Sequence, residues 1–353
     1  MNLVYNQEHI ITFKSFLFFS KVQFVPLFSF KFNEPRHERR RMNYQQFVNA
    51  VEKNLNQKME GGVKASCCRA VKNNGTERTG VVIEAPGINI SPTIYLEEYY
   101  DQYRKGRTME ETVDSLLQFY RSIRKEEPWD CSRLLDFEGI KDRIVFKLIN
   151  TEKNRVFLRD TPHRPFLDLS IVFYVLLEVN REGTAAMPVK DVHVKRWGVK
   201  EEMLWEAGVA NGMRLLPAEF ITMRYALREC MFQREMTGGG QNLLSDPAQD
   251  RDQMYVLSNQ LRNYGAASIV YPHILEMIGS ILRDDFYVLP SSVHEVVIVP
   301  ASAGICCSDM DAMVQEINET QVAAEEVLSD TAYFYDRRTD TLQFGTARGK
   351  EGE

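Results

Sequence analysis

Apolar residues recur at helical spacing in several parts of the chain, and two of these segments begin with a capping pair. Asn43 precedes Gln46 by three residues, and Thr108 precedes Glu111 by the same spacing, so each pair can bond the free N–H groups of a first helical turn. Pro128 bars continuation of the second helix. Helices are expected at about 43–60, 96–105, from Thr108 onward, 200–210, 217–231, 272–282 and 309–318.

Other segments have the short apolar runs of β-strands. An Asn-Gly turn at 73–76 predicts a hairpin, because this dipeptide tolerates left-handed backbone geometry. The longest apolar run of the body, Phe166–Leu177, is rich in β-branched and aromatic residues and indicates a buried central strand. Strands are expected at 63–72, 78–85, 166–177, 254–258, 266–270, 285–289 and 293–299, with a closing hairpin around 336–340.

The order of these elements mixes helices and strands without regular βαβ alternation. Such an order favours an α+β fold with a mixed, largely antiparallel sheet and packed helices. Thr237–Asp250, with three consecutive glycines and an Asp-Pro, is the best linker in the chain. The pattern therefore predicts an N-terminal region at 42–235, a linker at 236–252, a C-terminal region at 253–344 and a disordered tail at 345–353.

Residues 1–41 differ from the rest. They hold eight of the twenty Phe and carry a charge of +4, whereas the remainder carries −10. Lysines divide the apolar stretch, so it lacks the roughly 20 apolar residues of a membrane helix, and it has no secretory pattern. An interfacial anchor stays open. The preferred interpretation is a leader that is not part of the natural product, with Met42 as the first residue.

Composition and charge exclude several classes of protein. The chain of 353 residues is 44% hydrophobic and 26% charged, which is ordinary for a globular protein. An acidic body without a basic stripe argues against nucleic acid and against an anionic membrane as partner of residues 42–353. Neither a phosphate-binding loop nor a dinucleotide fingerprint is present, so no cofactor is expected. The six cysteines do not have the spacing of zinc-binding motifs, so no metal is expected. The preferred interpretation is that they are reduced thiols in a cytoplasmic protein.

Several runs resemble one family in one order. They include ISPTIYLEEYY at 90–100, KLINTEKN at 147–154, WGVKEEMLWE at 197–206, DFYVLPSSVHEVVIVP at 285–300 and NETQVAAEEVLSD at 318–330. The chain resembles an uncharacterised bacterial family, a domain of unknown function numbered 5688, from Met42 to about Phe344. The resemblance implies no activity. Gly208 departs from a helical pattern and predicts a weakened or kinked helix, since Gly costs about 1 kcal/mol against Ala there.

His294 is the first candidate site residue. In an extended strand Ser292 and His294 share a face and Glu295 lies on the other, so a Ser-His dyad would need an acid from elsewhere, such as Asp168 or Asp160. The alternative is a turn capped by serine, followed by a structural histidine in the sheet.

Asp160, His163 and Asp168 form the second candidate, because carboxylates beside a histidine can exchange protons. The structural alternative is that the TPHRP segment, 161–165, is only a tight loop leading into the buried strand.

Four tyrosines gather in the short helix expected at 96–105 and just before it. Tyr95, Tyr99 and Tyr103 share one face by i, i+4 spacing, with Tyr100 beside it. Such a face can recognise a protein partner or can pack against the sheet.

Two function classes follow from these candidates. The first is a cytoplasmic bacterial binding or interaction protein without enzymatic activity. The second is a hydrolase-type enzyme with a dispersed site around His294 or His163. Convergence of these histidines with a carboxylate in a pocket would favour the enzyme.

Overall fold

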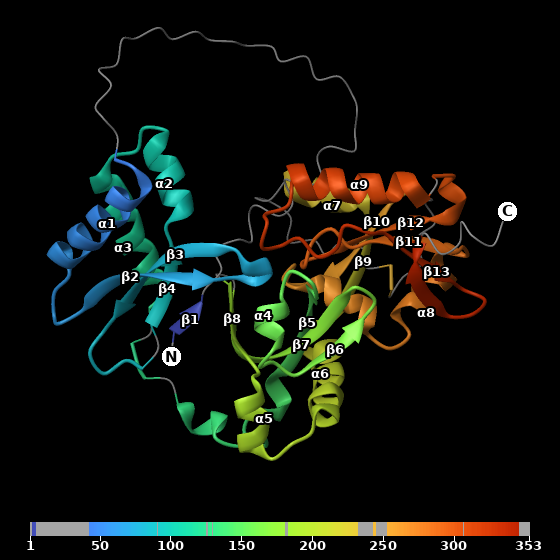
Figure 1. The fold of residues 1–353 in the computed structure, drawn as a ribbon, viewed down its shortest axis with the longest axis horizontal. Helices are drawn as coiled ribbons and strands as arrows, with labels where there is room; N and C mark the ends of the chain where they lie inside the picture. Colours follow the sequence, from blue (N-terminus) through green and yellow to red (C-terminus); the bar gives the residue numbers. More distant parts are fainter. Residues whose placement is uncertain are drawn as a thin grey trace, which may run out of the picture. The chain divides into compact units, whose positions relative to one another are not determined.

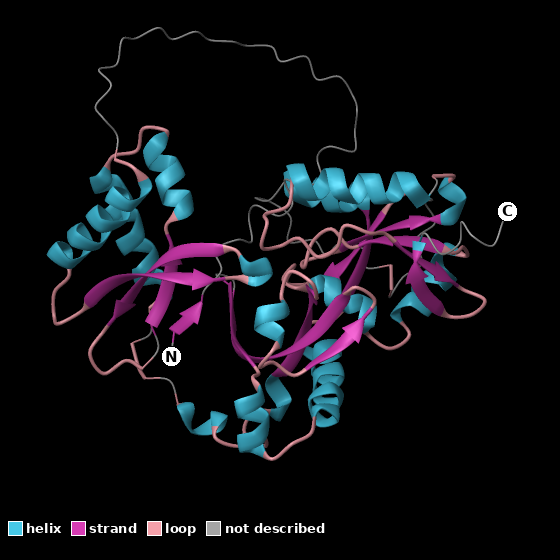
Figure 2. Ribbon diagram, in the orientation of Figure 1, coloured by secondary structure: helices cyan, strands magenta, loops and turns pink. Residues whose placement is uncertain are grey.

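The computed structural model describes residues 2–4, 42–89, 91–124, 126–128, 130–180, 183–231, 243–244, 253–305 and 307–345. These residues form two compact units (Figure 1). Described residues 2–4, 42–71 and 77–130 belong to the first unit, and 72–76 together with 131–345 belong to the second. Each unit combines helices with sheets that are mostly antiparallel, so the α+β prediction is confirmed (Figure 2).

The first unit is a four-stranded sheet covered by helices. Its strand order is β1-β4-β3-β2, in which β1 pairs with β4 in parallel and the other pairs are antiparallel. The strands are β1 (Asn2–Val4), β2 (Lys64–Val71), β3 (Glu77–Glu84) and β4 (Ser91–Tyr95). The helices are α1 (Tyr44–Lys58), α2 (Glu97–Arg104) and α3 (Met109–Ile123).

Both predicted capping pairs are present. Asn43 accepts the N–H of Gln46 at 2.9 Å, and Thr108 accepts that of Glu111 at 3.2 Å, with the reciprocal bonds made in each case. These bonds satisfy the N–H groups that a first helical turn leaves free. Local sequence therefore determined the start of α1 and α3.

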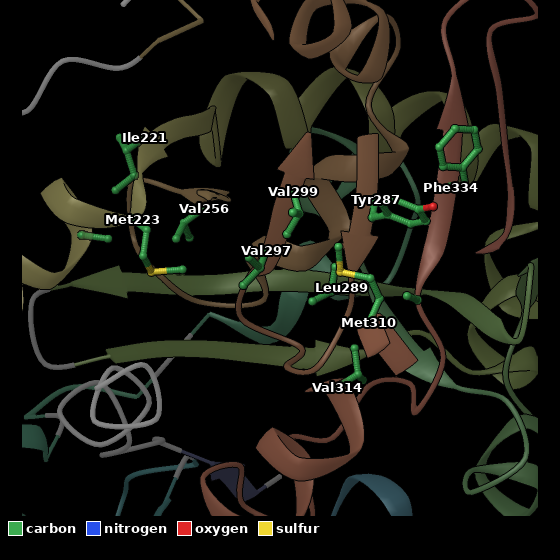
Figure 3. Packing of buried hydrophobic residues seen from close by; sticks show 12 residues of the cluster. Ile221, Met223, Val256, Tyr287, Leu289, Val297, Val299, Met310, Val314 and Phe334 are labelled. Atoms are coloured by element: carbon green, nitrogen blue, oxygen red, sulfur yellow. The ribbon is translucent and has the colours of Figure 1, made fainter. Parts of the chain in front are cut away.

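The second unit contains a six-stranded sheet with the order β14-β13-β11-β12-β10-β9, antiparallel throughout. Its strands are β9 (Ala218–Thr222), β10 (Tyr255–Asn259), β11 (Phe286–Leu289), β12 (Val296–Pro300), β13 (Tyr333–Asp336) and β14 (Thr341–Phe344). The helices α7 (Met223–Met231) and α9 (Cys307–Thr320) lie over one face. Met310 and Val314 of α9 pack there against Val297 and Val299 (Figure 3).

All five residues of β12 are buried, so the sheet is covered on both faces, as the apolar run predicted. The segments that follow β10 are η6 (Gly265–Val270) and α8 (Ile274–Leu282), and η6 packs on β10 and on β5.

A second sheet of this unit has β7 at its centre, between β5 and β6, with β8 paired along β7 as well. The strands are β5 (Ile144–Asn150), β6 (His163–Phe166), β7 (Leu169–Asn180) and β8 (Gly183–Pro188). The predicted central strand is thus confirmed as β7. Around this sheet lie α4 (Arg155–Leu158), α5 (Asp191–Trp197) and α6 (Glu201–Leu215), and the remaining short helices are η3 (Asn73–Gly75), η4 (Cys131–Leu134), η5 (Lys141–Arg143) and η7 (Ala301–Ala303).

Gly208 does not interrupt its helix, contrary to the sequence-based prediction. Helix α6 is continuous, and a Cβ at Gly208 would meet the ring of Phe146 at 3.0 Å. The glycine therefore lets α6 approach β5 closely, and this packing offsets its low helix propensity.

Three element predictions are wrong. Segment 217–231 is not one helix, because 218–222 pairs with β10 as a strand and only Met223–Met231 is helical. Segment 266–270 lies in a 3₁₀ helix, since a short buried apolar run does not distinguish strand from helix. The TPHRP segment ends in a strand, β6, and Pro165 is tolerated there because β6 is an edge strand.

The two units divide the chain near Asp130 and not at 236–252. Strands β9 and β10 flank the predicted linker and are hydrogen-bonded in one sheet, so 42–235 and 253–344 are not separate regions. Most of the predicted linker, most of the leader and residues 346–353 lie outside the described residues. Asn2–Val4 are described and pair with β4, so these three leader residues are not detached. Whether 1–41 belong to the natural product stays a prediction.

Within the described ranges, no helix combines the length and the apolar character that crossing a membrane requires.

Candidate ligand-binding site

Lys147 is the one polar side chain in the middle of a buried strand. Strand β5 reads Ile-Val-Phe-Lys-Leu-Ile-Asn, and every residue of it except Lys147 is buried. Alternation along the strand puts Lys147 on the same face as Val145 and Ile149. The antiparallel register with β7 pairs Val145 with Tyr174, which places Tyr174 on that face as well.

Two tyrosine rings hold the Lys147 amine. Its Nζ lies 4.4 Å from the centroid of the Tyr174 ring and 4.4 Å from that of Tyr264. Both distances are within the range in which an ammonium group is attracted to an aromatic face. Among the residues that the structure describes, no carboxylate pairs with this amine. Within the described residues, the two ring faces are therefore the groups that stabilise the positive charge of Lys147.

A small pocket of about 20 Å³, partly open to solvent, lies at Lys147. Its wall is mostly apolar and includes Val145, Leu176, Ala186 and Leu216, with the two tyrosine rings. The lining is of the mostly apolar kind found in small-molecule sites, and the volume accommodates one small apolar group.

Asn263 is the second polar residue of this pocket. It is only 4% exposed, and its backbone N–H and C=O bond to the side chain of Asn259. Its own carboxamide takes part in none of the hydrogen bonds made among the described residues.

Burial, and to a smaller extent the nearby charge of Lys72, lower the pKa of Lys147 to about 7. Removal from water disfavours the ammonium form, while the tyrosine faces favour it. The amine therefore changes its charge near neutral pH. Burial also raises the pKa of Tyr174 well above its ordinary value, so this phenol stays neutral.

His294 determines where the Tyr264 ring lies. Tyr264 has a left-handed backbone (φ 54°), which is unfavourable for a residue with a side chain. Its N–H donates to Nδ1 of His294 at 3.3 Å, and the two rings stack with centroids 5.6 Å apart. The histidine thus compensates the strained backbone and fixes the ring that faces Lys147.

The carboxylate beside His294 is that of Glu326. Nε2 of His294 lies 3.3 Å from Oε1 of Glu326, and both residues are buried. Since Nδ1 accepts a hydrogen bond, Nε2 carries the ring proton and faces the carboxylate. Glu295, 1% exposed, lies near this pair, and burial raises its pKa to about 7.

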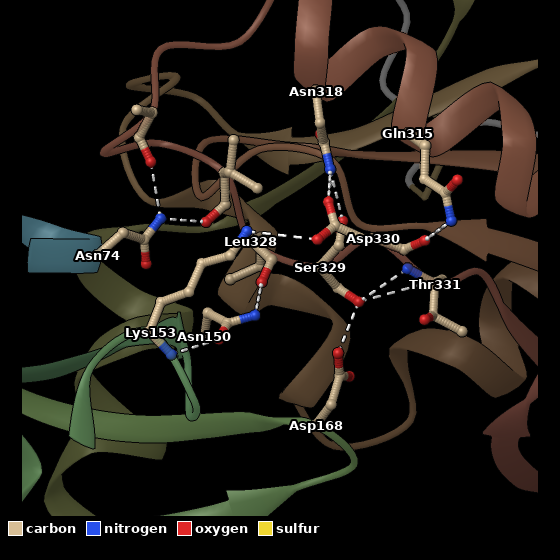
Figure 4. Close-up of polar contacts among 12 residues, drawn as sticks. Asn74, Asn150, Lys153, Asp168, Gln315, Asn318, Leu328, Ser329, Asp330 and Thr331 are labelled. Carbon is tan, nitrogen blue, oxygen red and sulfur yellow. Dashed lines mark hydrogen bonds and ion pairs between the residues drawn. The ribbon is translucent and has the colours of Figure 1, made fainter. Parts of the chain in front are cut away.

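A polar network fixes the segment that carries Glu326. Asn74 donates to the carbonyls of Ala324 and Val327, and Asn150 donates to that of Leu328 (Figure 4). The backbone then bonds Val293 N–H to the carbonyl of Glu326 at 2.9 Å. These contacts hold Glu326 beside His294.

The predicted Ser-His dyad is not formed. Residues 293–295 are bent and the strand starts at Val296, because the Ser292 hydroxyl accepts the N–H of His294 at 3.1 Å. The serine therefore serves the turn and not the imidazole.

The other sequence-predicted residues lie apart from His294. His163 is exposed and its Nδ1 is 2.8 Å from the carbonyl of Thr161. Asp160 pairs with Lys190 at 2.7 Å. Asp168 accepts hydrogen bonds from Ser329, at 2.7 Å, and from Tyr333. No acid of this second candidate cluster orients His294.

The predicted tyrosine face belongs to the core of the first unit. Tyr95 and Tyr99 are 9% and 5% exposed, so in this fold they do not present a surface to a partner. Tyr103 is half-buried and packs on Phe47 and Tyr100. These tyrosines therefore pack within the first unit, which is the structural alternative given above.

Sequence reasoning missed Lys147, Tyr174, Asn263 and Tyr264. A usable signal existed for the lysine, because a single cation flanked by Phe146 and Leu148 interrupts a run that is otherwise fully apolar. The other three residues come from β7 and from the loop after β10, and only the tertiary fold brings them to Lys147.

Within the described part of the chain, no group of three or more His, Cys, Asp or Glu side chains is arranged to hold a metal ion. One family model, described as a family of unknown function (DUF5688), matches residues 44–337. No curated protein and no solved structure matches the chain.

Proposed function

The chain belongs to this family of unknown function (DUF5688), which brings no activity with it, and we propose from the geometry that it is a small-molecule-binding protein without enzymatic activity. The observation that carries the proposal is the apolar pocket lined by Lys147, whose amine lies 4.4 Å from the ring centroids of Tyr174 and Tyr264 and has no carboxylate partner among the described residues. We also propose that the protein is bacterial and cytoplasmic and binds no nucleic acid, since its body is acidic.

The pocket suits a small, mostly apolar ligand. Val145, Leu176, Ala186 and Leu216 supply apolar contact, and a ligand of this kind gains about 25 cal/mol for each Å² of apolar surface that it buries. Removing such a ligand from water drives binding without any chemical step.

A hydrolase around His294 or His163 is the other candidate. Its support is the His294–Glu326 pair. Three observations weigh against it: His294 is 5% exposed, Ser292 bonds the backbone, and Nδ1 of His163 contacts the carbonyl of Thr161.

Displacement of a fluorescent probe tests the proposal. N-phenyl-1-naphthylamine, which is neutral and apolar, should become fluorescent on the protein, and 1-octanol should displace it. Ala186→Trp should abolish the fluorescence because the larger side chain fills the pocket, and Ala186→Leu should reduce it. Val192→Trp, at an exposed position of α5, is the matched control. Equal fluorescence in all variants, each folded by circular dichroism, would refute the proposal.

A further inference from the structure

We propose that Asn74 is a site of spontaneous deamidation that the fold protects, and that its amide reacts with the Gly75 backbone once the surrounding hydrogen bonds open. The inference goes beyond the proposed function and does not depend on the pocket. It stands on the geometry of the Asn-Gly turn, on the hydrogen bonds of the Asn74 side chain and on the exposure of Gly75.

The turn between β2 and β3 requires this dipeptide. Asn74 and Gly75 both have a left-handed backbone, with φ of 58° and 69°. Asparagine tolerates this conformation better than most residues, and glycine adopts it freely. Glycine also has no side chain that would hinder its nitrogen from reaching the amide of the preceding asparagine. The turn geometry therefore selects a pair that is chemically prone to deamidation.

The reaction needs no reagent other than water. The backbone nitrogen of Gly75 attacks Cγ of Asn74 and loses its proton, the bond from Cγ to Nδ2 breaks, and Nδ2 takes up a proton and leaves as ammonia. Water then opens the cyclic succinimide at either carbonyl, which yields aspartate or isoaspartate at position 74. Gly75 is exposed, so water reaches the turn.

Three hydrogen bonds hold the Asn74 amide in the folded protein. Nδ2 donates to the carbonyls of Ala324, at 2.9 Å, and Val327, at 2.7 Å, and Oδ1 accepts from Asn154 at 2.9 Å. Attack at Cγ makes this planar carbon tetrahedral, so Nδ2 and Oδ1 leave the directions that these bonds require. Loss of the bonds should slow the reaction on the order of a hundredfold relative to an unfolded chain.

Deamidation would remove an anchor of the segment 324–328. Aspartate has no amide N–H groups, so the carbonyls of Ala324 and Val327 would face a carboxylate oxygen in place of a donor. The segment that holds Glu326 beside His294 would thereby be loosened. Because hydrolysis of the amide is irreversible in water, the altered form would accumulate as the protein ages.

A second Asn-Gly pair supplies an internal control. Asn211-Gly212 is the other such pair in the sequence and lies inside α6. Nδ2 of Asn211 donates to the carbonyls of Lys141, at 2.6 Å, and Ile144, at 2.9 Å. Both amides are therefore bonded, but among the described residues Asn154 bonds the amide of Asn74 and not that of Asn211.

Peptide mass spectrometry, after incubation of the full chain at mildly alkaline pH below its melting temperature, measures acid formation at positions 74 and 211. Both positions should convert rapidly in urea and about a hundredfold more slowly in the folded parent. Asn154→Ala removes two hydrogen bonds to Asn74, so it should accelerate position 74 about tenfold and leave position 211 unchanged.

Conversion of position 74 in the folded parent as fast as in urea would overturn the proposal. An unchanged rate at this position in Asn154→Ala would overturn it as well. Acceleration at both positions would show that Asn154→Ala opens the whole fold, so Asn154→Ser, which keeps a small polar side chain, is compared alongside and should accelerate position 74 alone.

Asn74→Asp represents the product of the reaction. Its melting temperature should fall, and hydrogen exchange should become faster in peptides from 324–328, because two donors to this segment are lost. Asn49→Asp, at an exposed position of α1, is the matched control and should behave as the parent. Equal melting and exchange in the two variants would contradict the loss of an anchor.

Discussion

Tyrosines build both the core of the first unit and the pocket of the second, but in different ways. In the first unit Tyr44, Phe47, Tyr100 and Tyr103 contact one another, with ring centroids 5.0–5.3 Å apart for the pairs that include Tyr44 or Phe47. Their hydroxyls are used locally: that of Tyr44 donates to Glu97 at 2.7 Å. We call this cluster closed, because its rings contact one another.

In the second unit Tyr174 and Tyr264 each face Lys147 instead. Here the Lys147 amine takes the place that a further aromatic ring has in the first unit, and the three residues line a pocket. Packed rings stabilise the fold, whereas rings around a desolvated cation leave free energy that a ligand can recover. The comparison contrasts a closed cluster, which serves stability, with an open one, which under the proposed function serves binding.

The largest expected effect comes from Phe47→Ala in the closed cluster. Phe47 is 0% exposed, and truncation of a buried Phe leaves a cavity that costs about 3–5 kcal/mol. Hydrogen exchange followed by mass spectrometry should become faster in peptides from α1, while peptides from β5 keep their protection. Lys147→Met should not accelerate exchange in either region. Faster exchange in β5 for both variants would break the comparison.

His294→Ala comes second. It removes the acceptor of the Tyr264 N–H and takes the imidazole away from the buried Glu326 carboxylate, which costs about 3 kcal/mol. The melting temperature should fall and probe binding should weaken, since Tyr264 loses its position over Lys147. The double variant His294→Ala, Glu326→Gln should recover part of the melting temperature, because the carboxylate that lost the imidazole is then replaced by a neutral amide. An unchanged melting temperature with a complete loss of binding would instead make His294 a ligand-contacting residue.

Glu295→Gln has the smallest expected effect and depends on pH. Burial raises the pKa of Glu295 from 4.5 to about 7, so between these values the folded protein holds a proton that the unfolded chain has lost. Stability therefore falls as pH rises from 4.5 to 7. Glu295→Gln should be more stable than the parent at pH 8, by at most about 3 kcal/mol, and equal to it near pH 4.5. Urea unfolding at both pH values measures this, and a difference that does not change with pH contradicts the raised pKa.

Local sequence was sufficient where local interactions decide the structure. The caps of α1 and α3 and the Asn-Gly hairpin between β2 and β3 involve residues three or four apart, and all were predicted. The sequence-based prediction failed where partners far away in the sequence decide the structure of a segment. Segment 218–222 became a strand because β10, more than thirty residues further on, pairs with it.

The candidate site was predicted only in part, for the same physical reason. His294 was identified as a noteworthy residue, but its role depends on Tyr264 and Glu326, which lie about thirty residues away on either side. Lys147 resembled an ordinary polar residue in a strand until the fold placed two rings around it.

The protonation of Lys147 itself tests the central claim most directly. NMR titration of the protein labelled with ¹³C at lysine Cε, with Lys147→Arg to assign the signal, gives the pKa of this amine. The account predicts a pKa of about 7, because burial in the second unit disfavours the ammonium form. A pKa near the ordinary lysine value of about 10.4 would contradict it.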